Sequence, residues 1–109
     1  MSSRAYIKRV WRVPQDRGPV EYFATLVTKA LVKHGWPAVW KPDNLPGHNA
    51  FLIEYHEQKG IPAQDFWDAV SIAVRITART YRVDVIEHQG WVELVHPYKV
   101  TQGGHFKRV

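Results

Sequence analysis

Two segments of this sequence repeat apolar residues at spacings of three and four, and they constrain the fold more than any other feature. Between Pro19 and His34, and again between Pro62 and Tyr81, the repeat predicts an amphipathic helix, because residues three and four apart share one helix face. Acidic residues early and basic residues late in each segment complement the helix dipole. The apolar positions are Val20, Phe23, Ala24, Val27, Ala30 and Leu31 in the first segment and Phe66, Ala69, Val70, Ala73, Ile76 and Thr77 in the second.

Strand-like segments surround the two predicted helices. Residues 4–13 mix β-branched and aromatic residues with basic ones, which predicts an edge strand or an extended arm. Short strands are predicted over 38–40 and 49–56, and the runs on either side of Gln89-Gly90 predict a hairpin within 83–96. The order β-α-β-β-α-β-β predicts an α+β fold in which two helices pack on one face of a small, mainly antiparallel sheet. We expect the other face of that sheet to be partly open.

The chain length of 109 residues suits a single domain. We expect residues 1–100 to form this domain and residues 101–109 to be a mobile basic tail, because that segment is polar and contains two glycines. No apolar run approaches the ~20 residues of a membrane helix, and the N-terminus lacks a signal-peptide pattern. The sequence therefore predicts cytoplasmic synthesis and no membrane partner, with later incorporation into a virion left open.

The absence of cysteine limits the chemistry of any site. Disulfides, thiolate zinc sites and cysteine nucleophiles are excluded, so a metal would have to bind histidines and carboxylates. Zinc peptidases need about three such ligands, together with a carboxylate that takes the proton of the attacking water. His48, Glu54 and the later Glu93-Leu94-Val95-His96 segment contain groups of these types.

Two segments partially resemble the zinc motifs of the phage-type D-Ala-D-Ala carboxypeptidases and L-alanyl-D-glutamate endolysin peptidases, which cut the stem peptides of peptidoglycan. They are the segment from Pro46 to Tyr55, which contains His48, and the Glu-x-x-His segment at 93–96. The segment Leu31–Ala38 also resembles the one that precedes the first motif in phage members. The resemblance implies a zinc cofactor, a peptidoglycan substrate, zinc ligands at His48, Glu54 and His96, and a general base at Glu93.

Basic and aromatic residues support two alternatives to a peptidase. Arg75, Arg79 and Arg82 share one helix face, and Arg9 and Trp11 form a second group near the N-terminus. Such groups contact phosphates and stack on bases, which predicts a nucleic-acid-binding module. Protein interfaces also favour arginine and tryptophan, so the chain could equally be a non-catalytic virion or assembly component that binds another phage protein or forms an oligomer. The net charge of +5 favours acidic partners without choosing among these classes.

Overall fold

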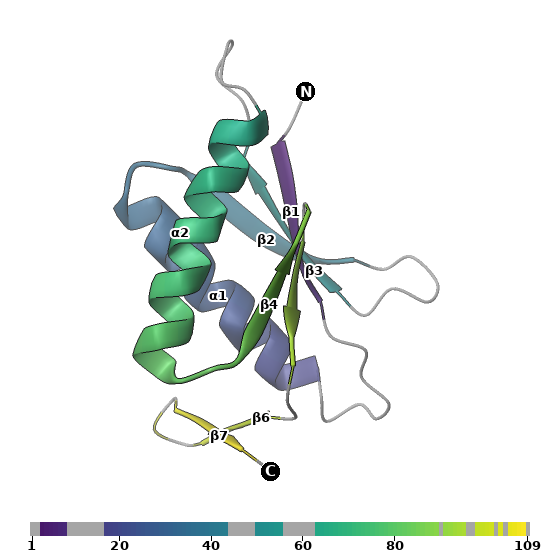
Figure 1. The fold of residues 1–109 in the computed structure, drawn as a ribbon, viewed down its shortest axis with the longest axis vertical. Coiled ribbons are helices and arrows are strands. Elements are labelled where there is room, and N and C mark those ends of the chain that lie inside the picture. The colour runs from purple at the N-terminus through teal and green to yellow at the C-terminus, as the bar shows by residue number, and fades with distance from the viewer. Residues whose placement is uncertain are drawn as a thin grey trace.

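The computed structural model describes residues 3–8, 17–43, 50–55, 63–89, 91–95, 98–101, 103 and 105–108. Within these residues, two helices and seven strands follow the order β1-α1-β2-β3-α2-β4-β5-β6-β7 (Figure 1). The helices are α1 (Arg17–Lys33) and α2 (Ala63–Tyr81). The strands are β1 (Ser3–Lys8), β2 (Ala38–Asp43), β3 (Ala50–Tyr55), β4 (Val85–His88), β5 (Trp91–Leu94), β6 (Tyr98–Val100) and β7 (Phe106–Arg108).

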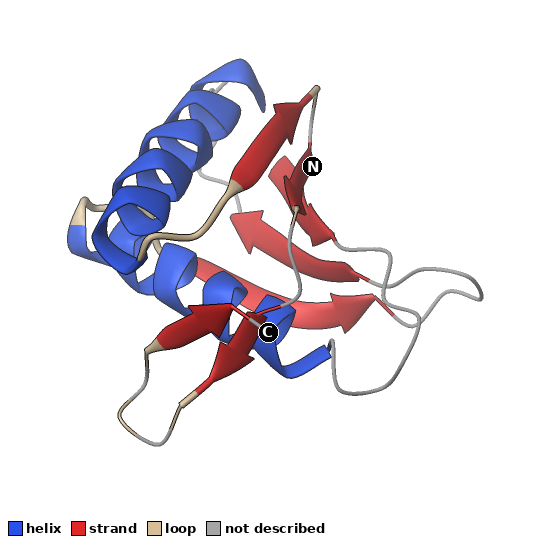
Figure 2. Cartoon of the chain, turned by 60° about the horizontal axis from the view of Figure 1, so that its bottom comes forward, coloured by secondary structure: helices blue, strands red, loops and turns tan. Residues whose placement is uncertain are grey.

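The strands form two sheets. Five of them make one sheet in the order β2-β3-β1-β5-β4, and β6 and β7 make a separate two-stranded antiparallel sheet. In the larger sheet all pairs are antiparallel except β1 with β5, which is parallel. Figures 1 and 2 show both helices on the same side of the larger sheet. The predicted α+β class is confirmed, whereas the predicted arrangement with one sheet is not, because β6 and β7 form a second one.

The strand β1 lies inside the sheet rather than at its edge, where the sequence placed it. Its register pairs Ala5 with Ile53 and Ile7 with Val92, and both partners belong to the hydrophobic core. The register therefore gives β1 a neighbour on both sides, β3 along its whole length and β5 along Tyr6–Lys8.

The predicted mobile tail over 101–109 contains β7, which contributes to the core. The Phe106 ring lies 5.1 Å from Tyr22 and 6.2 Å from both Phe23 and Tyr81, measured between ring centroids. Burial of this aromatic ring offsets the cost of ordering the segment. Phe106 therefore packs against aromatic residues of both helices.

One hydrophobic core lies between the helices and the larger sheet. In β3, Phe51 and Ile53 belong to this core, whereas Leu52 and Glu54 alternate with them and lie on the other face of the sheet. Leu52 and Glu54 are nevertheless buried, whereas their partners on β2, Lys41 and Val39, are exposed, so this face is covered along β3 and open along β2. The core residues are Val20, Phe23, Ala24, Val27, Leu31, Ala38, Phe51, Ile53, Phe66, Val70, Ala73, Val74, Val83, Val92 and Leu94.

Candidate functional site

The two carboxylates predicted to serve a zinc ion lie far apart in the sheet. Glu54 pairs with Arg4 of β1, and Glu93 pairs with Lys8 of the same strand. Four residues along β1 span about 13 Å, and two strand spacings add about 10 Å across the sheet, so the two Cα atoms are roughly 16 Å apart. A zinc ligand lies about 2 Å from the ion. The structure therefore does not bring Glu54 and Glu93 to one zinc ion. The other two predicted ligands, His48 and His96, lie outside the described residues.

Glu54 occupies a structural position. Its side chain is only 5% exposed, and its Oε2 atom lies 3.3 Å from the Nζ atom of Lys41, whose side chain is 58% exposed. A buried carboxylate is costly unless a cation or hydrogen-bond donors compensate for its lost hydration. The ion pair with Lys41 supplies part of that compensation.

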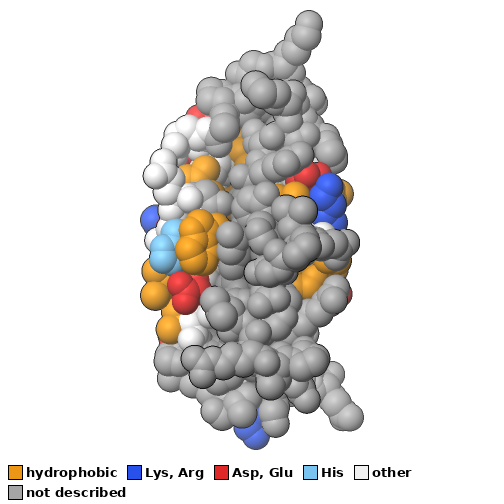
Figure 3. Space-filling model, turned by 90° about the vertical axis from the view of Figure 1, so that its right-hand side faces the viewer, with side chains coloured by type: hydrophobic (Ala, Val, Ile, Leu, Met, Phe, Trp, Pro, Cys, Tyr) orange, Lys and Arg blue, Asp and Glu red, His pale blue; other side chains and the backbone are white. Residues whose placement is uncertain are grey.

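Glu93, the predicted general base, contacts the ring of His88. Its Oε1 atom lies 3.1 Å from Nε2 of His88, and the His88 ring stacks on Trp91 at a centroid distance of 3.9 Å with an interplanar angle of 7°. Figure 3 shows histidine, acidic and hydrophobic side chains gathered on one flank of the molecule. A single imidazole and a single carboxylate are too few for a zinc site, and no group of three ligating side chains occurs in the described part of the chain.

The cluster of His88, Trp91 and Glu93 was not predicted as a site from the sequence. The sequence feature that could have indicated this cluster is the predicted two-residue turn at Gln89-Gly90. Such a turn fixes the hairpin register and places His88 directly opposite Trp91.

The arginines expected to form one basic row have different surroundings. The Nε atom of Arg75 donates to Oε1 of Glu87 at 3.0 Å, and Ser71 Oγ donates to the other oxygen of the same carboxylate at 2.7 Å. Arg79 and Arg82 are exposed. Because the Arg75 guanidinium is paired with an acid, the row of charges predicted to contact successive phosphates is interrupted. The predicted Arg9 and Trp11 lie outside the described residues.

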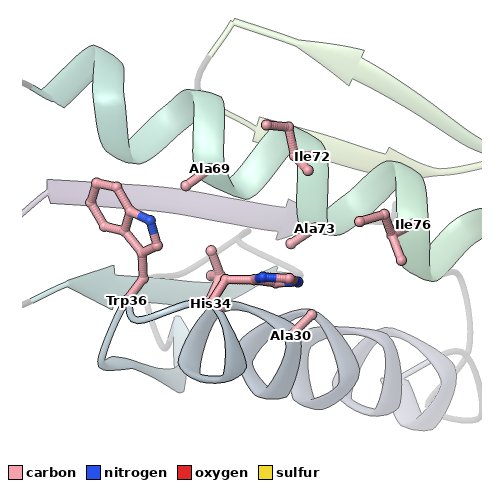
Figure 4. Close-up of a pocket in the computed structure, with 8 residues that line it drawn as sticks. Ala30, His34, Trp36, Ala69, Ile72, Ala73 and Ile76 are labelled. Carbon is pink, nitrogen blue, oxygen red and sulfur yellow. The ribbon is translucent and has the colours of Figure 1, made fainter.

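An apolar groove of about 240 Å³ is lined by residues from α2 and from the end of α1 (Figure 4). Ile72 and Ile76 of α2 form one wall, and Ala30 and His34 form the other. The two isoleucines are 56% and 48% exposed. The sequence assigned Ile76 to the buried face of the helix, but α2 turns Phe66, Val70 and Val74 into the core and leaves Ile76 beside the gap between the helices.

The end of α1 positions an aromatic side chain in this groove. The backbone N–H of Trp36 donates to the carbonyl of Leu31 at 2.9 Å, and that of Gly35 donates to the carbonyl of Val32 at 3.1 Å. These two bonds define a Schellman motif, which requires the left-handed conformation that Gly35 adopts with φ 88°. The reversal brings Trp36 against Phe66 at a centroid distance of 6.0 Å.

Zinc titration of a carboxylate variant tests the predicted metal set. We expect Glu54→Gln to bind zinc with the same affinity as the original chain, because the sheet holds Glu54 too far from Glu93, the predicted general base, for both to serve one ion. Isothermal titration of the metal-free proteins measures the affinity. A loss of about tenfold or more in Glu54→Gln would contradict the expectation, since removal of a true ligand weakens a zinc site at least as much as removal of an outer partner.

Neither described helix has the length and apolar character needed to cross a bilayer. Two surface features of the described residues combine side chains from different elements or strands. They are the groove between α1 and α2 and the cluster of His88, Trp91 and Glu93 on the β4–β5 hairpin. No protein-family model matches this chain, and no curated protein or solved structure matches it either.

Proposed function

We propose that this protein is a non-catalytic component of a protein assembly and that it binds its partner through the groove between α1 and α2. The observation that carries the proposal is the exposure of Ile72 and Ile76 beside an apolar groove. Contiguous apolar surface of this kind marks contact sites in small proteins, whereas isolated exposed apolar residues are common and need no explanation. Here the two isoleucines, one turn apart, are contiguous with the groove.

The energetics favour a role for these isoleucines in binding. Complete burial of an isoleucine side chain is worth about 1.5–3 kcal/mol, of which the free chain realises only part at positions 72 and 76. Isoleucine is also a weaker helix former than leucine or alanine. Two exposed isoleucines thus contribute little to folding but much to an interface that covers them.

The alternatives have weaker support. A peptidase with the expected residues needs Glu54 and Glu93 at one ion, and the sheet register separates them. A nucleic-acid module built on the α2 arginines needs Arg75, whose guanidinium pairs with Glu87.

Site-specific photocrosslinking tests the proposed binding surface. A photoreactive amino acid replaces Ile72 in the full chain, and Val32, which is 53% exposed on α1 but does not line the groove, is replaced as the matched control. We expect a discrete crosslinked polypeptide only from position 72. After identification by mass spectrometry and purification, this partner should bind the chain with an affinity that Ile72→Glu weakens by about tenfold or more, because that change buries a charge.

The opposite result would be equal crosslinking from positions 72 and 32, or a partner whose affinity is the same for Ile72→Glu and Val32→Glu. Either outcome would remove the groove as the binding surface.

A further inference from the structure

The exposed stripe of α2 carries opposite charges at its two ends. Asp65, Asp68, Ile72, Ile76 and Arg79 follow one another at spacings of three, four, four and three residues, so they lie along one side of the helix. All five are exposed. The stripe therefore begins with carboxylates, continues with the isoleucines of the groove wall and ends with a guanidinium.

The two ends of this stripe are complementary in charge when two copies meet antiparallel. Position 72 lies midway between positions 65 and 79. When two copies of α2 meet antiparallel at Ile72, each Asp65 faces Arg79 of the other copy, the two Ile72 side chains meet at the centre, and each Ile76 lies opposite Asp68. A two-fold axis produces every such contact twice.

We infer that the occupant of the groove is a second copy of this chain, held by an antiparallel contact between the two α2 helices across a two-fold axis. The inference rests on the proposed function, because it names the partner of the same surface. The groove suits a helix, since its alanines, Ala30, Ala69 and Ala73, allow the close approach at which packed helices lie about 8–10 Å apart.

The charges distinguish this arrangement from its rivals. A parallel contact would place Asp65 against Asp65 and Arg79 against Arg79, which is repulsive at both ends. A uniformly acidic partner helix, which the net charge of +5 would attract, would pair with Arg79 but meet Asp65 and Asp68 at the other end of the stripe. A second copy turned antiparallel instead places opposite charges at both ends of the stripe, because each Asp65 faces an Arg79.

Charge reversal at the two ends of the stripe provides the test. We expect sedimentation of the original chain to show a dimer that dissociates in the micromolar range. Arg79→Glu and Asp65→Arg should each weaken this dimer by about tenfold or more, because each variant creates two like-charge contacts. Lys107→Glu, on β7, is the control for the change in net charge and should dimerise like the original chain.

Mixing the two single variants separates a charge effect from a folding defect. In a mixed dimer, the arginine introduced by Asp65→Arg in one chain faces the glutamate introduced by Arg79→Glu in the other. The unchanged Arg79 of the first chain faces the unchanged Asp65 of the second, so both contacts are attractive. The mixture should therefore form a heterodimer about as tight as the original dimer, and circular dichroism should show the same helix content in all variants. Misfolding could not produce this recovery.

Two results would overturn the inference: a monomeric original chain up to millimolar concentration, or a dimer in which the single variants are unaffected and the mixture shows no preference for the heterodimer. If position 72 still crosslinks to a different protein in either case, the proposed function stands and only the identity of the partner is wrong. If no protein crosslinks there, both fail.

Discussion

Replacement of Phe66 by alanine is expected to lower the free energy of unfolding by about 3–5 kcal/mol. Phe66 is fully buried in the core and packs against Trp36 at a centroid distance of 6.0 Å. Its truncation removes apolar burial and leaves a cavity that the helices and sheet cannot fill completely. Because small domains are stable by only about 5–15 kcal/mol, chemical denaturation should show a large shift of the unfolding midpoint.

Ile72→Ala is the matched control for this prediction. Its side chain is 56% exposed on the same helix, so we expect a loss of about 1 kcal/mol or less. Both variants should be measured at a protein concentration that keeps the chain monomeric, because a dimer adds stability that depends on concentration. Equal losses for the two variants would show that Ile72 serves folding, and would remove the main support for its role in binding.

The helices could be predicted closely because their signals are local. The sequence predicts helices over 19–34 and 62–81, and the structure has Arg17–Lys33 and Ala63–Tyr81. The spacing of apolar residues and the glycine at position 35 belong to the segments themselves, so no knowledge of distant contacts is needed. The hairpin of β4 and β5 is predictable for the same reason, since its turn joins neighbouring strands.

The sheet order depends on contacts between distant parts of the chain. β1 lies between β3 and β5, and its pairing with β5 is parallel. Nothing in residues 3–8 alone specifies two neighbours, because alternating apolar and charged residues occur in central and edge strands alike. The packing of Phe106 is unpredictable from its own segment for a similar reason, because its aromatic partners lie on α1 and at the end of α2.

The candidate site was harder to predict than the fold. The expected zinc set relied on residue types and on their spacing along the chain, whereas the separation of Glu54 from Glu93 follows from the strand that lies between β3 and β5. The groove has no signature of its own in the sequence. Small side chains from both helices line it, and periodicity alone cannot distinguish a position at the edge of the core, such as Ile76, from one inside it.

Lys41→Met is expected to lower the free energy of unfolding by about 2 kcal/mol. Removal of one partner of a fully buried ion pair costs about 3–5 kcal/mol, and the smaller value applies here because solvent screens the exposed ammonium group of Lys41. The loss arises from the carboxylate of Glu54, which stays buried and loses the contact with the Lys41 ammonium group. Lys29→Met, at an exposed position of α1, removes the same charge and should change stability by about 0.5 kcal/mol or less.

A second substitution identifies the origin of that loss. Adding Glu54→Leu to Lys41→Met should recover most of the stability, because apolar residues of similar size often replace a buried ion pair without cost. Zinc should leave the unfolding midpoint of Lys41→Met unchanged if Glu54 is structural. A midpoint that rises with zinc concentration would instead mean that the native state of this variant binds the metal, since a ligand of the folded state stabilises it by mass action. If zinc raises the unfolding midpoint of Lys41→Met but not that of the double variant, Glu54 is a zinc ligand.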